Sequence, residues 1–264
     1  MNQLPPSEPS DDCREYSSLP AETPSAIPIV PPVFRPLSGY ARWLFFLFLL
    51  LMILYAADWY YSARICRVLE ALRDTSDSGL LSEYAARMDW LETRTAWIAA
   101  GTILVSIPVC IFFCLWGYRA AVNAVHAARQ PVELKPGFFI GSFFIPVLNL
   151  WNPYMGMKRL YNISRGCETA GYRRFTWLVA FWWFGFLVFE TADTATFHLF
   201  QNADRAVDTM DESAENLDRF LSLCRDAYFC TLVSDALAIG AAVAAVFLVR
   251  RVTRAQTEMK ERLF

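Results

Sequence analysis

Four long apolar runs constrain the fold of this chain more than any other feature. They cover about 40–57, 95–117, 175–192 and 227–249. A helix needs roughly 20 apolar residues to cross about 30 Å of hydrocarbon, and each run reaches or approaches that length. Of the 264 residues, 55% are hydrophobic and only 19% are charged, so the chain is more apolar than a typical soluble domain. The runs predict an all-α integral membrane protein with four transmembrane helices.

A fifth apolar stretch, at about 137–153, is too short and too interrupted to cross a bilayer. Pro146 and Pro153 each remove a backbone donor and disfavour a helical residue before them, and Asn149 adds a polar side chain. Irregular backbone at membrane depth is tolerated only where protein or water satisfies its polar groups. We therefore expect a re-entrant or interfacial segment that packs against the bundle.

The positions of Lys and Arg predict the orientation, because these residues concentrate in short cytoplasmic loops. Eight lie between the second and third runs and five follow the fourth run, whereas 190–226 has three among many carboxylates. The first outer loop, 58–94, weakens the contrast because it holds five arginines. The distribution predicts that both termini are cytoplasmic.

The remaining organisation consists of an arm, two similar halves and a tail. Residues 1–38 hold nine of the fourteen prolines and no early apolar core, which predicts a disordered cytoplasmic arm without a cleavable signal peptide. The arm either binds a partner protein in extended form or is a solvated leader. The membrane domain is expected at 39–252 and a cytoplasmic tail at 253–264.

Each half of the membrane domain reads as a span, an outer loop and a span. The first loop carries Ile65, Val68, Leu69 and Leu72 at the spacing of an amphipathic helix, and the second loop repeats such a stripe from Ala203. Both loops are expected to form helices that pack on the outer end of the bundle or lie along the membrane surface. The predicted fold is thus a four-helix transmembrane bundle of two similar halves with amphipathic outer-loop helices.

A few polar residues inside or beside the spans could carry chemistry. Asp235 lies well inside the fourth run, and Glu190 ends the third run at a similar level; the two either share a proton or a cation, or Asp235 is protonated or bonded locally. Cys66 and Cys224 fall in the two predicted outer loops, where an oxidising environment would allow a disulfide between them. With two histidines and no recognised enzyme motif, we expect no catalytic residues, no metal site, no cofactor and no nucleic-acid partner.

The second run continues beyond the membrane with a polar and aromatic stripe. Trp116, Arg119, Asn123 and His126 recur every three or four residues and therefore share a helix face. In one interpretation, Arg119 reaches the headgroups while Asn123 and His126 are solvated. In the other, the stripe packs against the broken segment at 137–153.

These residues also carry a resemblance to a known family. Trp116-x-x-Arg119-x-x-x-Asn123, Pro136-Gly137 and Gly141-x-x-Phe144-x-Pro146-x-x-Asn149-Leu150-Trp151-x-Pro153 together resemble the bacterial membrane family named domain of unknown function 4328. The resemblance implies a four-span protein of the bacterial cytoplasmic (inner) membrane and no assigned activity. Its characteristic residues correspond here to Trp116, Arg119, Asn123, Pro146, Asn149, Trp151 and Pro153.

The resemblance favours a joint role for the stripe and the broken segment. Arg119 and Asn123 are expected to bond carbonyls exposed by the prolines, Asn149 to bond back to the stripe, and Trp151 to lie at the interface. The competing hypothesis makes the same residues line a ligand or ion site that opens to the cytoplasm.

Three functional hypotheses follow from these features. The first is a non-enzymatic interaction or sensor protein whose partners are the lipid bilayer and, through the N-terminal arm, other membrane or cytoplasmic proteins. The second is a small transporter or channel-like homo-oligomer with a cytoplasmic vestibule, because broken helices are common beside transporter sites. The third is a membrane enzyme without a recognised motif.

Overall fold

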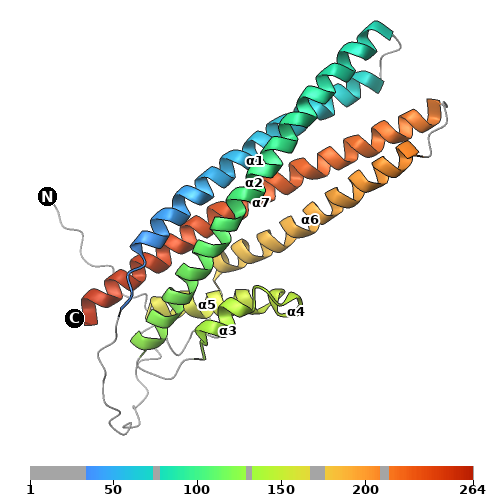
Figure 1. Cartoon of the computed structure of the whole chain (residues 1–264). Helices are drawn as coiled ribbons and strands as arrows, with labels where there is room; N and C mark the ends of the chain where they lie inside the picture. Colours follow the sequence, from blue (N-terminus) through green and yellow to red (C-terminus); the bar gives the residue numbers. More distant parts are fainter. Residues whose placement is uncertain (1–33, 74–77, 129–132, 167–175, 209–213, 264) are drawn as a thin grey trace, which may run out of the picture. The chain divides into compact units, whose positions relative to one another are not determined.

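The computed structural model describes residues 34–73, 78–128, 133–166, 176–208 and 214–263, and every regular element in these ranges is a helix. In chain order (Figure 1) they are α1 Ser38–Arg73, α2 Ser78–Ala127, α3 Pro136–Gly141, α4 Pro146–Asn149, α5 Asn152–Ser164, α6 Trp177–Asp208 and α7 Ala214–Leu263. The predicted all-α fold class is confirmed. Most of the predicted arm, 1–33, lies outside the described residues.

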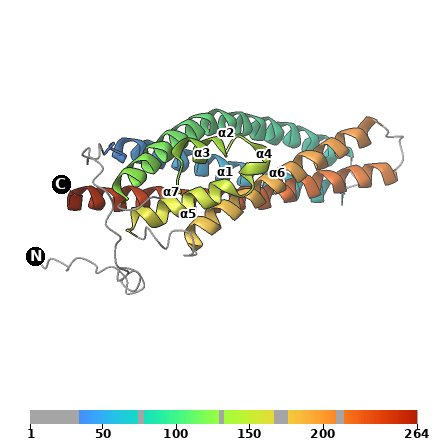
Figure 2. The ribbon, with the colours of Figure 1, turned by 90° about the horizontal axis from the view of Figure 1, so that it is seen from below.

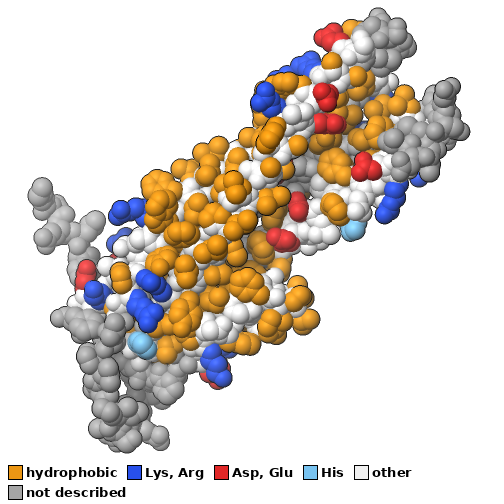
Figure 3. All heavy atoms as spheres, in the orientation of Figure 1, with side chains coloured by type: hydrophobic (Ala, Val, Ile, Leu, Met, Phe, Trp, Pro, Cys, Tyr) orange, Lys and Arg blue, Asp and Glu red, His pale blue; other side chains and the backbone are white. Residues whose placement is uncertain are grey.

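Within the described ranges, four helices, α1, α2, α6 and α7, are long and apolar enough to cross a membrane, which confirms the four-span prediction. Large apolar side chains cover much of their surface (Figure 3), and Ile103 and Leu104 of α2 are 67% and 70% exposed. Such a surface is unfavourable in water and suits a hydrocarbon environment.

The chain divides into two compact units. Unit 1 comprises Met1–Gly39, Cys114–Trp177 and Val249–Phe264, and unit 2 comprises Tyr40–Phe113 and Leu178–Leu248. The broken segment belongs to unit 1 and the greater part of the four long helices to unit 2.

Ring contacts set the register of the helices in unit 2. The rings of Tyr55 in α1 and Phe189 in α6 lie 5.9 Å apart, and those of Phe200 in α6 and Tyr228 in α7 lie 5.0 Å apart. Farther along, α1 contributes Ile65 and Leu69 to a buried cluster that also includes Tyr228 and contacts Phe200. α1 and α6 therefore run in the same direction, and α7 runs opposite to both.

The amphipathic stripes predicted for the outer loops are present, but they are continuations of the long helices rather than separate helices. α1 extends without interruption through Ile65 and Leu69 to Arg73, and α7 begins well before the fourth apolar run. The physical reason is that no glycine or proline lies between Asp58 and Arg73 to end the helix. An ion pair between Arg73 and Asp218, with N–O distances of 2.8 and 3.3 Å, joins the extensions of α1 and α7.

Unit 1 contains three short helices: α3 and α4, which form the broken segment, and α5, which begins at its end. α3 and α4 lie alongside α5 (Figure 2), and a proline stands in the first turn of each. Proline suits that position because its missing N–H has no partner in the first turn of a helix. None of the three approaches the roughly 20 residues of a membrane span, so the broken segment is not a fifth span.

Candidate functional site

The polar and aromatic stripe of α2 continues into unit 1, where its two ends are buried. Trp116 and Asn123 are seven residues apart, or about two helical turns, and therefore share a face. Their exposed fractions are 0% and 1%. Arg119, between them, is half-buried, and His126 is exposed. The interpretation that Asn123 is solvated is therefore wrong.

The Asn123 amide is bonded to the backbone that leads into α1. Its Oδ1 accepts a hydrogen bond from the Arg35 N–H at 2.9 Å, and its Nδ2 donates one to the Arg35 carbonyl, also at 2.9 Å. The side chain thus satisfies both backbone polar groups of a residue that no helix includes. This pairing fixes the last residues before α1 against α2.

A second buried amide, Gln256 of α7, continues the same network. Asn123 Nδ2 donates its other hydrogen to Gln256 Oε1 at 3.2 Å. Gln256 Nε2 donates to the Ala120 carbonyl at 2.8 Å and to Ser164 Oγ at 3.0 Å. All four amide hydrogens of Asn123 and Gln256 are therefore used. We call the set formed by Arg35, Ala120, Asn123, Ser164 and Gln256 the amide junction.

Trp116 makes the second polar link between α2 and α7 in unit 1. Its indole Nε1 donates a hydrogen bond to Thr253 Oγ1 at 3.1 Å, so the fully buried ring carries no unsatisfied N–H. Thr253 lies three residues before Gln256, on nearly the same face of α7. Trp116 and Asn123 of α2 therefore bond to neighbouring positions of α7, Thr253 and Gln256.

The broken segment satisfies its own backbone instead of using the stripe. The carbonyls of Phe138, Ile140 and Gly141 accept local N–H groups at 2.9 to 3.2 Å, and that of Ile145 accepts the Asn149 N–H at 2.7 Å. The prediction that Asn123 bonds carbonyls of this segment is wrong, because its amide bonds Arg35 and Gln256 in the amide junction instead. The Asn149 Oδ1 is buried and has no hydrogen-bond partner. This oxygen therefore accepts no hydrogen bond from the stripe, where a bond from Asn149 to the stripe was expected.

Ring packing joins the broken segment to α2 and α5. The Phe139 ring, 3% exposed, lies where a side chain on Gly156 of α5 would be and is in contact with the position of a side chain on Gly117 of α2. A Cβ on Gly156 would overlap this ring, and one on Gly117 would lie 3.2 Å from Ile140 Cδ1. Gly156 therefore permits a close approach of Phe139 that a side chain would prevent, and Gly117 provides room beside Ile140.

The other face of the broken segment is apolar and exposed. Val147 is 78% exposed, Phe144 is 66% exposed, and Trp151 is 54% exposed with its ring 5.4 Å from Tyr154. Pro146 is also exposed at the start of α4, whereas Pro153 is fully buried in the first turn of α5. This face has the composition of a segment that contacts lipid, which agrees with the expected interfacial position of Trp151.

α5 is the most buried of the short helices, and it buries charge as well as apolar side chains. Lys158 is only 8% exposed, and burial, assisted by the nearby Arg159 guanidinium, lowers the pKa of its ammonium group. Arg159 Nη1 in turn donates to the Glu133 carbonyl at 2.8 Å.

The ionisable residues predicted inside the spans lie in unit 2. Asp235 of α7 is 4% exposed, its Oδ2 lacks a hydrogen-bond partner, and its strongest charged neighbours are Asp58 and Asp193. Glu190 is on the exposed side of α6. The sequence predicted a level shared by Glu190 and Asp235, whereas the charged groups nearest in effect to Asp235 are Asp193 and Asp58, the residue directly after the first apolar run.

Cys66 and Cys224 are both free thiols that pack against the same apolar cluster of unit 2. The disulfide considered for this pair is therefore not formed in the structure.

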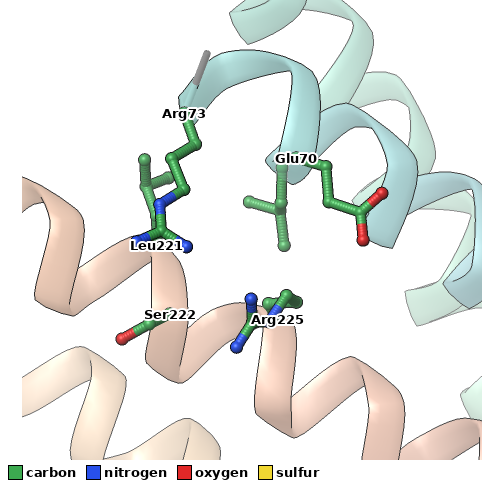
Figure 4. Close-up of a pocket in the computed structure, with 6 residues that line it drawn as sticks. Glu70, Arg73, Leu221, Ser222 and Arg225 are labelled. Atoms are coloured by element: carbon green, nitrogen blue, oxygen red, sulfur yellow. The ribbon is translucent and has the colours of Figure 1, made fainter.

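Two cavities are found in the part of unit 2 that the structure describes, and no residue of the family motif lines either of them. One, of about 280 Å³, lies between the extensions of α1 and α7 and is lined by Glu70, Arg73, Ser222 and Arg225 among others (Figure 4). The other lies between α6 and α7 near Arg205 and Arg219. Within the described ranges, no group of three or more His, Cys, Asp or Glu side chains could hold a metal ion.

The arrangement in unit 1 is suited to holding backbone segments together. Asn123 and Gln256 are neutral, buried and fully bonded, so neither is available to a ligand without breaking internal bonds. Sequence reasoning missed Gln256, Thr253 and Ser164. A signal for Gln256 exists, because Val249, Val252 and Gln256 follow the i, i+3, i+7 spacing of a buried stripe.

Comparison with known proteins supplies a family but no function. The family model described as Domain of unknown function (DUF4328) matches residues 76–254, which is more than half of the chain. The matched range includes the whole segment from Trp116 to Pro153. No curated protein and no solved structure matched the chain.

Proposed function

The chain belongs to the family described as Domain of unknown function (DUF4328), and from this membership and the amide junction we propose that it is a non-enzymatic membrane protein of the interaction or sensor type. In this proposal the arm at 1–38 binds other proteins, and the amide junction holds the root of the arm. The family description assigns no activity, so the proposal depends on the residues themselves.

The observation that carries the proposal is the double hydrogen bond between Asn123 and the Arg35 backbone. Asn123, a residue of the family motif, binds the backbone of Arg35, where the proline-rich arm ends. Through Gln256 the same bond network reaches α7. A protein bound to the arm would therefore be mechanically linked to two of the long helices, as a sensor or scaffold requires.

We place the protein in the bacterial cytoplasmic membrane with both termini in the cytoplasm. The basic residues on the segments between α2 and α6 and after the fourth apolar run support this orientation.

The orientation predicts the labelling of Cys167, which lies in the basic region outside the described residues. In intact spheroplasts, a membrane-impermeant maleimide is expected to leave Cys167 unmodified, and permeabilisation is expected to expose it. The measurement is peptide mass spectrometry, with a cysteine introduced at Asp77 as a matched position in the predicted outer loop. Labelling of Cys167 before permeabilisation would contradict the orientation.

The interaction proposal predicts a partner that crosslinks through the arm. A photoreactive amino acid at Ile29 in native membranes is expected to yield a reproducible heterologous adduct, whereas one at Lys260 is not. Extended proline segments bind grooves lined by aromatic rings, so replacing Pro31 and Pro32 with alanine is expected to reduce the yield several-fold. Asn123→Ala should reduce it too, because it releases the root of the arm.

Adducts that contain only further copies of this chain would contradict that prediction and favour the second candidate, a small transporter or channel-like homo-oligomer. One observation supports this candidate: the buried Asn149 Oδ1 lacks a protein partner, as a group that faces a polar ligand would. The buried state of Asn123 counts against a vestibule that reaches the amide junction.

A further inference from the structure

Asp235 is a buried carboxyl group of unit 2. It lies eight residues inside the fourth apolar run, or about 12 Å along the helix. The side chain is 4% exposed, and Oδ2 has no hydrogen-bond partner. A carboxylate at the centre of a membrane helix is unfavourable by roughly 2.5–3.5 kcal/mol on insertion scales, and such residues are usually functional.

The register of the helices brings two further carboxylates to the same level. Phe200 of α6 contacts Tyr228 of α7, and two turns from that contact along both antiparallel helices stand Asp193 and Asp235. The Tyr55 ring of α1 contacts Phe189 of α6, and one turn farther along these two helices stand Asp58 and Asp193. Three helices therefore each contribute an aspartate to one layer of unit 2.

Electrostatic interactions agree with this register. The charged groups that act most strongly on Asp235 are Asp58 and Asp193, and Tyr55 interacts with both of them, with Asp235 and with Glu190. Of the three aspartates, Asp193 is exposed, Asp58 is half-buried and Asp235 is buried. The layer thus leads from the surface of unit 2 to its interior.

No basic side chain neutralises this layer from within the described part of unit 2. On α2, the contacts of Leu54 with Gly101 and of Tyr61 with Trp90 place Arg94 near the level of Asp58. The Arg94 guanidinium instead lies over the Trp90 ring, 5.1 Å from its centroid, on the exposed side of α2. Glu92, the other charged residue nearby on α2, adds negative charge.

Two hydroxyl groups near Asp235 are also buried and unsatisfied. Ser234 Oγ is adjacent in sequence, and Ser62 Oγ lies one turn beyond Asp58 on α1; neither has a hydrogen-bond partner. Their residues are 2% and 1% exposed. A hydroxyl group can accept a hydrogen bond from a neutral carboxyl group or donate one to a carboxylate, so these serines add polar capacity to the layer in either protonation state.

We propose that Asp235, flanked by Asp58 and Asp193, is a proton-binding site within the membrane-spanning helices. A proton from the adjoining solution adds to a carboxylate oxygen of Asp235, which removes one of three neighbouring negative charges and creates a hydrogen-bond donor. A proton needs one oxygen atom, whereas a metal ion needs several convergent ligands, and the aspartates do not form such a group. The site is independent of the amide junction and of the arm.

The proposal predicts the reaction of Asp235 with a hydrophobic carbodiimide, which modifies protonated carboxyl groups. With the full-length protein in lipid nanodiscs, peptide mass spectrometry is expected to find Asp235 modified at pH 7. Above the pH of half-protonation the modification should fall about tenfold per pH unit. Asp58→Asn and Asp193→Asn should each lower the modification of Asp235 several-fold at a fixed pH on that slope, because they remove a repelling charge.

Asp226→Asn is the matched control. Asp226 is on the same helix, but it is exposed and its Oδ1 lies 3.2 Å from Arg225 Nη2, so its replacement should change the modification of Asp235 less than twofold. Three results would overturn the proposal: no modification of Asp235 from pH 5 to 9, equal effects of all three variants, or saturable protection by Na⁺ or K⁺ relative to choline. The last would identify an alkali-cation site instead. The modification of Asp235 from pH 5 to 9 and its protection by Na⁺ or K⁺ are measured on the wild-type protein, so they test the proposal even if a variant fails to fold.

Discussion

Replacing Asn123 with alanine is expected to lower the midpoint of thermal unfolding of the purified protein by roughly 5–10 °C. The change deletes three hydrogen bonds of a buried amide and leaves the Arg35 N–H and carbonyl and Gln256 Oε1 without their partner. Each buried polar group left unpaired destabilises the folded state by about 1–3 kcal/mol, and because Arg35 is exposed, water can replace part of the lost bonding to its backbone. A net destabilisation of about 2–3 kcal/mol corresponds to the stated shift for a protein of this size.

Asn123→Asp is expected to be at least as destabilising as Asn123→Ala, although it preserves the shape of the side chain. The aspartate keeps an acceptor for the Arg35 N–H but turns an oxygen toward the Arg35 carbonyl and Gln256 Oε1, where Asn123 donates. It also places a charge at a site that is 1% exposed. This order of the two variants separates lost hydrogen bonds from lost volume.

A local measurement accompanies the unfolding midpoint. Chymotrypsin cleavage after Phe34 should become several-fold faster in Asn123→Ala at a temperature where the rest of the protein stays folded, because the Arg35 backbone is released. Asn202→Ala is the matched control, since Asn202 is exposed on α6 and accepts only a long 3.4 Å bond from Arg205. Equal midpoints and equal cleavage in the Asn123 and Asn202 variants would disprove the structural role of the amide junction.

Replacing Gly156 with alanine is expected to destabilise the protein by about 1–3 kcal/mol, the usual effect of overpacking a core. The new methyl group overlaps Cδ2 of Phe139 and lies within 3.1 Å of Cγ, which is too close to the backbone of Phe139 to move aside. The ring is also confined by Phe143, at 5.7 Å between centroids. Alanine favours a helix over glycine by roughly 0.5–1 kcal/mol, so the clash outweighs this gain.

Gly137→Ala provides the comparison, because a Cβ on Gly137 meets no atom within 4 Å. It should leave the unfolding midpoint unchanged or slightly raised. Phe139→Leu introduced into Gly156→Ala should recover part of the loss, since the smaller side chain vacates the space of the ring. If the double variant is as unstable as the sum of the two single variants, Phe139 is not the residue that excludes a side chain at position 156.

The long helices could be predicted from the sequence because hydrophobicity over 20 residues is a local property. The prolines likewise revealed the breaks at α3, α4 and α5, since a proline acts on its own backbone and on the residue before it. The outer extensions were less predictable. Their stripes were visible, but the continuity of α1 from the span to Arg73 depends on the absence of a helix-ending residue, which is a weak signal.

The partners in unit 1 could not be predicted in the same way. Asn123 bonds the backbone of a residue 88 positions away and the side chain of one 133 positions away. A backbone N–H or carbonyl carries no mark of its partner in the sequence, so Arg35 was not distinguishable from its neighbours. The proline-broken segment was the obvious place for unsatisfied carbonyls, but local turns satisfy them first.

The members of the Asn123 bond network are synthesised at widely separated times. Arg35 is made before any of the long helices, Asn123 at the end of the second, and Gln256 only after the fourth has been made. In a ribosome-bound chain, Asn123 can therefore bond Arg35 before Gln256, its other partner, has been made. Unit 1 becomes complete only after the spans of unit 2 have been synthesised. A chain that stalls before residue 256 would enter the membrane with an amide junction that lacks Gln256.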